Sequence, residues 1–79
     1  MDFRAVLDFE RGPWQGSARK QQAIRERFGL SPARYHQVLD RVLELPEALE
    51  YDPMLVRRLR RLREARRAKR FAQRLGRDA

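Results

Sequence analysis

Arg34 and Gln37 lie three residues apart in an amphipathic segment, residues 32–43, and both side chains could read DNA bases. Arginine can pair with guanine, and glutamine with adenine, through two hydrogen bonds in the major groove. The preceding Ser31, together with the free amides at a helix start, could hold a phosphate. The chemistry of this segment is therefore suited to contact with double-stranded DNA.

The outward face of this segment qualifies that interpretation. It comprises Ala33, Arg34, Gln37, Asp40 and Arg41, with His36 on its flank. Asp40 would repel a phosphate backbone unless it pairs with Arg41 or accepts a hydrogen bond from a cytosine amine. His36 is a further candidate for contact with nucleic acid, and it is expected to be a surface residue rather than a metal ligand. Because the same residue types occur on solvated helix faces, base contact and plain solvation both stay open.

A second candidate site is the arginine-rich C-terminal part of the chain. Residues 1–52 carry eight Arg or Lys against nine Asp or Glu, whereas residues 53–79 carry eleven against two. A nearly neutral unit followed by a basic arm is typical of proteins that bind polyanions. We expect the arm to contact phosphates through Arg57, Arg58, Arg60, Arg61, Arg63, Arg66, Arg67, Lys69 and Arg70.

The composition argues against several classes of function. The absence of cysteine excludes disulfides and thiolate metal sites, and a single histidine argues against a histidine-built one. No apolar run approaches the ~20 residues that span a bilayer, and no signal-peptide pattern begins the chain. We therefore expect a cytoplasmic, nucleoid-associated protein with no cofactor and no membrane partner.

Other conspicuous residues are expected to serve the fold rather than catalysis. Tyr35 should lie in the core with its hydroxyl at the surface, and Trp14 should cover a helix junction rather than stack on bases. The carboxylates of Asp8 and Glu10 should lie on a solvated helix face. Because no carboxylate forms a catalytic arrangement with His36 or with a hydroxyl, an enzyme is not expected.

Helix signals punctuate the chain, whereas the alternating pattern of a strand is absent. The first helix is expected over residues 3–10, the second from its cap at Ser17 to Phe28, and the third from Ser31-Pro32 to its stop at Leu45-Pro46. A short helical turn is expected over 46–51, and the last helix from Asp52-Pro53 to Leu75. Expected helix starts are Asp2, Ser17, Ser31-Pro32 and Asp52-Pro53; expected stops are Gly12-Pro13, Gly29, Leu45-Pro46 and Gly76. The first half of the last helix should dock on the core, and its second half should face solvent or be ordered by a partner.

The second and third helices, joined by Gly29-Leu30-Ser31, match the plan of a helix-turn-helix. Arg25 departs from that plan, because a small residue usually stands where the two helices cross. The inward positions would be Ile24, Phe28, Tyr35 and Val38, with Leu30 plugging the turn. The expected fold is all-α: a three-helix helix-turn-helix core (1–52), including a short turn, and a basic C-terminal helix (53–79).

Three stretches of the chain resemble a family of short, mostly actinobacterial proteins of uncharacterised function. These are residues 6–11, AIRERFGLSPARYHQVLDRVL (23–43) and PEALEYDPMLVRRLRRLREARR (46–67). The resemblance implies an intracellular bacterial helix-turn-helix protein. More distantly, FGLSPARYHQVLDR is similar to the helix-turn-helix of the last sigma-factor region, which meets promoter DNA and RNA polymerase.

These observations favour a DNA-binding transcriptional regulator or nucleoid-associated protein, with a homodimer as an option because one small helix reads few bases. A protein-interaction module that docks on RNA polymerase or a sigma factor is the first alternative, since fold alone does not determine function. An RNA- or ribosome-binding protein is the second. The basic arm suits nucleic acid, and Asp40 suits a protein partner.

Overall fold

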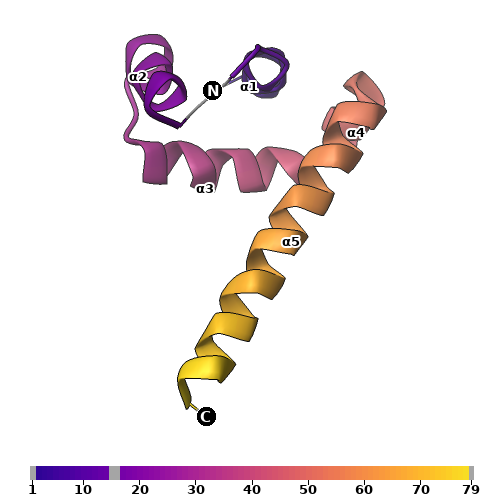
Figure 1. Cartoon of the computed structure of the whole chain (residues 1–79). Coiled ribbons are helices and arrows are strands. Elements are labelled where there is room, and N and C mark those ends of the chain that lie inside the picture. The colour runs from indigo at the N-terminus through magenta and orange to yellow at the C-terminus, as the bar shows by residue number, and fades with distance from the viewer. Residues whose placement is uncertain (1, 15–16, 79) are drawn as a thin grey trace.

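The computed structural model describes the backbone of residues 2–14 and 17–78, and the side chains of residues 2–14 and 18–73. Within these residues the fold is all-helical (Figure 1). The helices are α1 (Phe3–Glu10), α2 (Ser17–Phe28), α3 (Pro32–Leu43), α4 (Pro46–Tyr51) and α5 (Pro53–Asp78). Four of the five match the predicted ranges. The fifth differs, because α5 continues past Gly76, the predicted stop; an interior glycine costs a helix only about 1 kcal/mol relative to alanine.

Local hydrogen bonds explain where most of the helices begin. The carboxylates of Asp2 and Asp52 accept from the backbone amides of Arg4 (3.0 Å) and Leu55 (3.2 Å). Ser31 Oγ accepts from the amide of Arg34 (3.2 Å), one of the helix-start amides that lack a partner within the helix. These caps confirm three predicted starts; the fourth, at Ser17, rests on a side chain outside the described residues.

The turn between α2 and α3 depends on Gly29. Its φ of 65° lies in the left-handed region, which glycine adopts without the steric penalty that a Cβ brings. The amide of Gly29 donates to the carbonyl of Arg25 (2.9 Å), which closes the last turn of α2. The prediction that the second helix stops at Gly29 is therefore confirmed.

The core lies where α1, α3, α4 and the first turns of α5 meet, with α2 packed across α3. Its buried side chains are Val6, Leu7, Phe9, Ile24, Tyr35, Leu39, Val42, Leu43, Ala48, Leu55 and Val56. Phe28, Leu30 and Val38 pack against the edge of the core. Arg25, which stands where a small residue was expected, is exposed, so its charged end stays in solvent.

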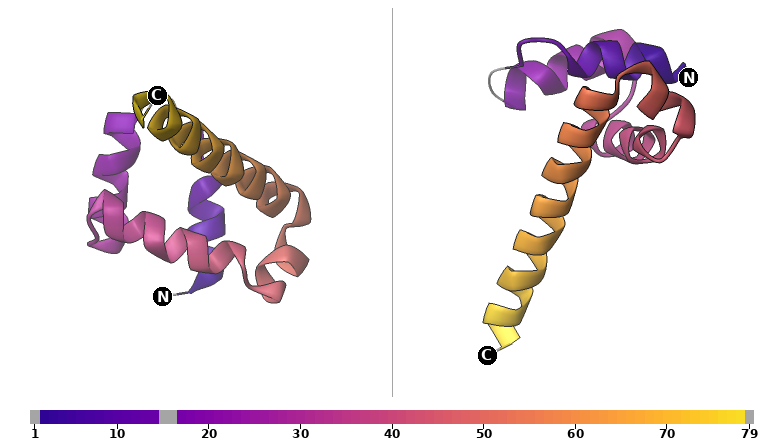
Figure 2. Two further views of the ribbon diagram at one scale, coloured as in Figure 1. Left: turned by 90° about the horizontal axis from the view of Figure 1, so that it is seen from below. Right: turned by 90° about the vertical axis from the view of Figure 1, so that its right-hand side faces the viewer.

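Helix α5 leaves the core after its first turns and projects away from the other helices (Figures 1 and 2). Leu55 and Val56 are buried, whereas Leu62 is 47% exposed and Phe71 63% exposed. The prediction that only the first half docks is confirmed. Within the described residues, no helix is both long enough and apolar enough to cross a membrane.

Two predictions about aromatic and acidic residues need correction. The hydroxyl of Tyr35 is buried, not at the surface, and it donates to Glu10 Oε2 at 2.6 Å. Glu10 is itself only 7% exposed, and its Oε1 accepts from Lys20 Nζ at 2.9 Å. The predicted solvated carboxylate is thus buried, because one neutral and one cationic donor satisfy it. Trp14 does cover Phe9, with ring centroids 4.6 Å apart.

Candidate nucleic-acid interface

The exposed face of α3 carries Arg34, Gln37 and Arg41. Arg34 Nη1 donates to Gln37 Oε1 at 3.1 Å, so these two side chains extend together from the first half of the helix. Ser31 lies at the start of the same helix, where its hydroxyl caps the amide of Arg34. The structure thus brings together four of the residues that were predicted to contact DNA.

The rest of the predicted outward face of α3 lies on a different side. Ala33, His36 and Asp40 line a cleft of about 310 Å³ between α3 and α5. The pKa of His36 is lowered, first by partial burial and then by the positive charges of Lys20 and Arg66. Because Asp40 lines the cleft, it faces α5 rather than the side of α3 that carries Arg34 and Gln37. This division removes the acidic side chain from the surface that would meet bases.

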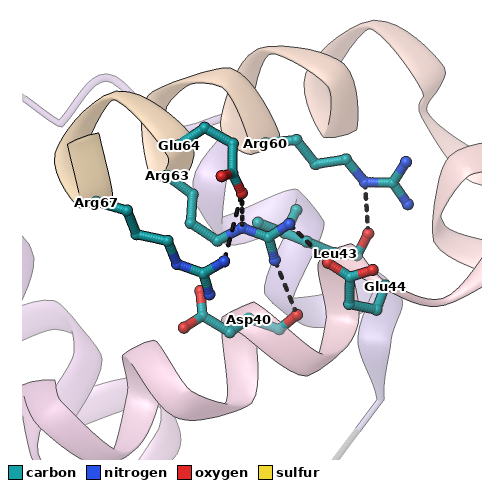
Figure 3. A network of polar contacts seen from close by, with 7 residues as sticks. All are labelled: Asp40, Leu43, Glu44, Arg60, Arg63, Glu64 and Arg67. Carbon is teal, nitrogen blue, oxygen red and sulfur yellow. Dashed lines mark hydrogen bonds and ion pairs between the residues drawn. The ribbon is translucent and has the colours of Figure 1, made fainter.

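Two arginines of α5 fasten that helix to the C-terminal end of α3 (Figure 3). Arg60 Nε donates to the carbonyl of Leu43 at 2.7 Å, and Arg63 Nη1 to the carbonyl of Asp40 at 3.4 Å. Arg63 Nη2 also donates to Glu44 Oε1 at 2.6 Å, and this contact lowers the pKa of Glu44. The last carbonyls of a helix lack partners within it, so cationic donors bind them readily.

Arg60 and Arg63, which we name the brace, were predicted to contact phosphates. Instead, the side chain of Arg63 is 14% exposed, and both residues make contacts to α3. Counting charge along the arm could not separate them from the other cations. The missed signal is the spacing of Arg63. It follows Leu59 by four residues and so continues the docked side of α5.

The other predicted arm residues are exposed. Some of them line the cleft, and the rest lie on other sides of α5. Arg66, Arg67 and Arg70 line the cleft with α3. On other sides of the helix lie Arg57, Arg58, Arg61 and Lys69. Lys20 of α2 also lines the cleft. It was not predicted as a site residue, because nothing in its local pattern relates it to α5.

Comparison with known proteins places the chain in a family but assigns no activity to it. No curated protein and no solved structure matches the chain. A family model matches residues 2–71, a range that includes the exposed face of α3, the brace and the cleft. The chain belongs to the family described as "Protein of unknown function (DUF3263)".

Proposed function

We propose that the protein binds double-stranded DNA. In this proposal α2, the turn at Gly29 and α3 form a helix-turn-helix, α3 enters the major groove, and α5 follows the phosphate backbone. The observation that carries the proposal is the exposed set Arg34, Gln37 and Arg41 on α3, beside a helix lined with exposed cations. A regulator of transcription and a nucleoid-associated protein would both use this surface.

The geometry around α3 supports this role. Tyr35, Leu39 and Val42 anchor the inner side of the helix in the core, so its opposite side is presented on a rigid element. Pro32 has no N–H, and the amides of Arg34 and Tyr35 donate to Ser31, so the amide of Ala33 is left at the start of α3 for a phosphate oxygen. Arginine and glutamine at adjacent exposed positions are the side chains that read guanine and adenine.

The charge of α5 supports the same partner. Apart from the brace residues, the exposed cations of α5 within the described residues are Arg57, Arg58, Arg61, Arg66, Arg67, Lys69 and Arg70. Each phosphate that such a cation neutralises releases counterions from DNA, so affinity falls as salt rises. If all seven engage, the slope of log K against log salt is about −6.

The test is a titration of the full chain with a library of duplexes at several salt concentrations. Arg34→Ala/Gln37→Ala should lose the preference among duplexes, because base contacts determine sequence selection. The matched control is Gln22→Ala/Arg25→Ala, which removes the same two residue types from the exposed side of α2. We expect the control to keep the ranking of duplexes, even where its overall affinity falls.

Three outcomes would contradict the proposal or its reading role for α3. If no duplex binds at physiological salt, DNA is not the partner, and RNA polymerase or a sigma factor becomes the candidate to test. If structured RNA competes better than duplex at matched salt, the basic arm serves RNA instead. Equal loss of preference in both double variants would show that α3 has no special part in reading sequence.

A further inference from the structure

The cleft between α3 and α5 has a mixed lining that the proposed base contacts do not use. Apolar side chains from both helices form part of its wall, among them Leu39, Leu43 and Leu59. Five Lys or Arg side chains and two carboxylates also line it, together with the neutral His36. The cleft therefore carries an excess of positive charge next to the exposed face of α3.

One side of α5 changes character at this cleft. Leu55 and Leu59 face the core on that side, and Arg63, Arg66 and Arg70 continue it at helical spacing. A docked helix normally keeps apolar residues on its inner side. Here the inner side becomes basic where α5 leaves the core, so its cations face α3 across an open space.

The carboxylates of the cleft do not balance these cations. Glu10 is already held by the hydroxyl of Tyr35 and by Lys20, and Arg63 pairs with Glu44 outside the cleft. Arg67 lies 3.4 Å from Glu64 Oε1, which leaves Asp40 as the carboxylate of the cleft that faces Arg66 and Arg70. Lys20 of α2 and Arg66 of α5 both line the cleft, and the positive charge of each lowers the pKa of His36. Converging cations with too few carboxylates are the arrangement that an anion stabilises.

We propose that the cleft between α3 and α5 is a phosphate-binding site, with Lys20, Arg66 and Arg70 as the donors. This inference rests on the proposed function in one respect: the phosphate is expected to be a phosphodiester of the strand that borders the groove entered by α3. A free polyphosphate offers the same chemistry. Lys20 can serve although it binds Glu10, because its ammonium group has three donors.

The only histidine of the chain is a reporter of occupancy. Partial burial, Lys20 and Arg66 lower the pKa of His36, whereas Glu10 and Asp40 act in the opposite direction. An anion in the cleft adds negative charge beside the ring and favours its protonated form. Binding should therefore raise the pKa of His36, and NMR titration of its ring protons measures this directly.

The experiment compares two double variants of the full chain. Arg66→Gln/Arg70→Gln removes two cations of the cleft, and Arg57→Gln/Arg61→Gln removes two from another side of α5. A short duplex and inorganic tripolyphosphate are the probes. We expect the first variant to weaken duplex binding about fivefold more than the second and to abolish the ligand-induced rise in the pKa of His36. A response to the duplex alone identifies the phosphodiester as the ligand, and a response to tripolyphosphate alone identifies the free anion.

The outcomes separate this inference from the proposed function. If the two double variants lose equal affinity and both keep the His36 response, the cleft proposal is overturned while DNA binding stands. If the unsubstituted chain binds no duplex, the proposed function fails. The response of the His36 pKa to tripolyphosphate then tests the cleft proposal. A His36 response that Arg66→Gln/Arg70→Gln abolishes would then support it, and no response would overturn it.

Discussion

At the scale of single residues, the buried carboxylate of Glu10 joins three helices. It accepts from Tyr35 of α3 at 2.6 Å and from Lys20 of α2 at 2.9 Å, while its own backbone belongs to α1. Burial, followed by this hydrogen bond, raises the pKa of Tyr35, so its hydroxyl stays protonated and remains a donor. A buried charge with its partners in place is tolerated, but removal of one partner is costly.

Tyr35→Phe should therefore lower the free energy of unfolding by about 1.5–3 kcal/mol, because a buried carboxylate loses a hydrogen bond. Tyr51→Phe is the matched control, because its exposed hydroxyl donates to the exposed Asp8 (2.9 Å); it should change the free energy of unfolding much less than Tyr35→Phe does. Urea unfolding followed by Trp14 fluorescence measures both. Equal stability of the two variants would mean that Glu10 does not depend on Tyr35.

At the scale of elements, the orientation of α5 against α3 depends on the brace. Arg60 and Arg63 bind carbonyls at the C-terminal end of α3, where α5 leaves the core (Figure 3). Between the two brace residues Leu62 is already half exposed, and beyond Arg63 the cleft cations Arg66, Arg67 and Arg70 are exposed. The brace thus holds α5 against the C-terminal end of α3, beside the cleft.

Arg63→Leu should lower the free energy of unfolding by about 1–2 kcal/mol, because it removes donors to Glu44 and to the carbonyl of Asp40. Arg67→Leu is the control: its side chain is 58% exposed and lies 3.4 Å from Glu64 Oε1, so a change within about 0.5 kcal/mol is expected. Thermal unfolding followed by circular dichroism gives both values. If Arg63→Leu is as stable as the unsubstituted chain, the brace does not fasten α5.

At the scale of the whole molecule, local signals predicted the elements, and distant contacts decided the site. Gly29 and Ser31-Pro32 act through neighbours one to four residues away, so their roles could be predicted from the sequence. Glu10 and Arg63 have partners 25 and 19 residues away, and without those partners each looks like a solvated charge. The cleft could not be predicted for the same reason, since Lys20 and α5 meet only in the folded chain.

The same distant contacts imply that residues 1–52 depend on α5 for their stability. Leu55 and Val56 lie beyond that boundary and belong to the core, at 6% and 0% exposure. Burying two such side chains contributes roughly 3–6 kcal/mol. A domain of about 52 residues has a total free energy of unfolding of about 3–8 kcal/mol, at 0.05–0.15 kcal/mol per residue. A chain that ends at residue 52 should therefore show no cooperative thermal transition.

A chain that ends after Glu64 is the matched comparison, because it keeps Leu55, Val56 and the brace while losing the cleft cations beyond Arg63. We expect it to unfold cooperatively, within a few degrees of the full chain, and to bind duplex DNA with a much shallower salt dependence. Calorimetry and a salt titration measure these two properties separately. Cooperative unfolding of the chain that ends at residue 52 would show that the core needs no part of α5, and the arm would then be an independent appendage.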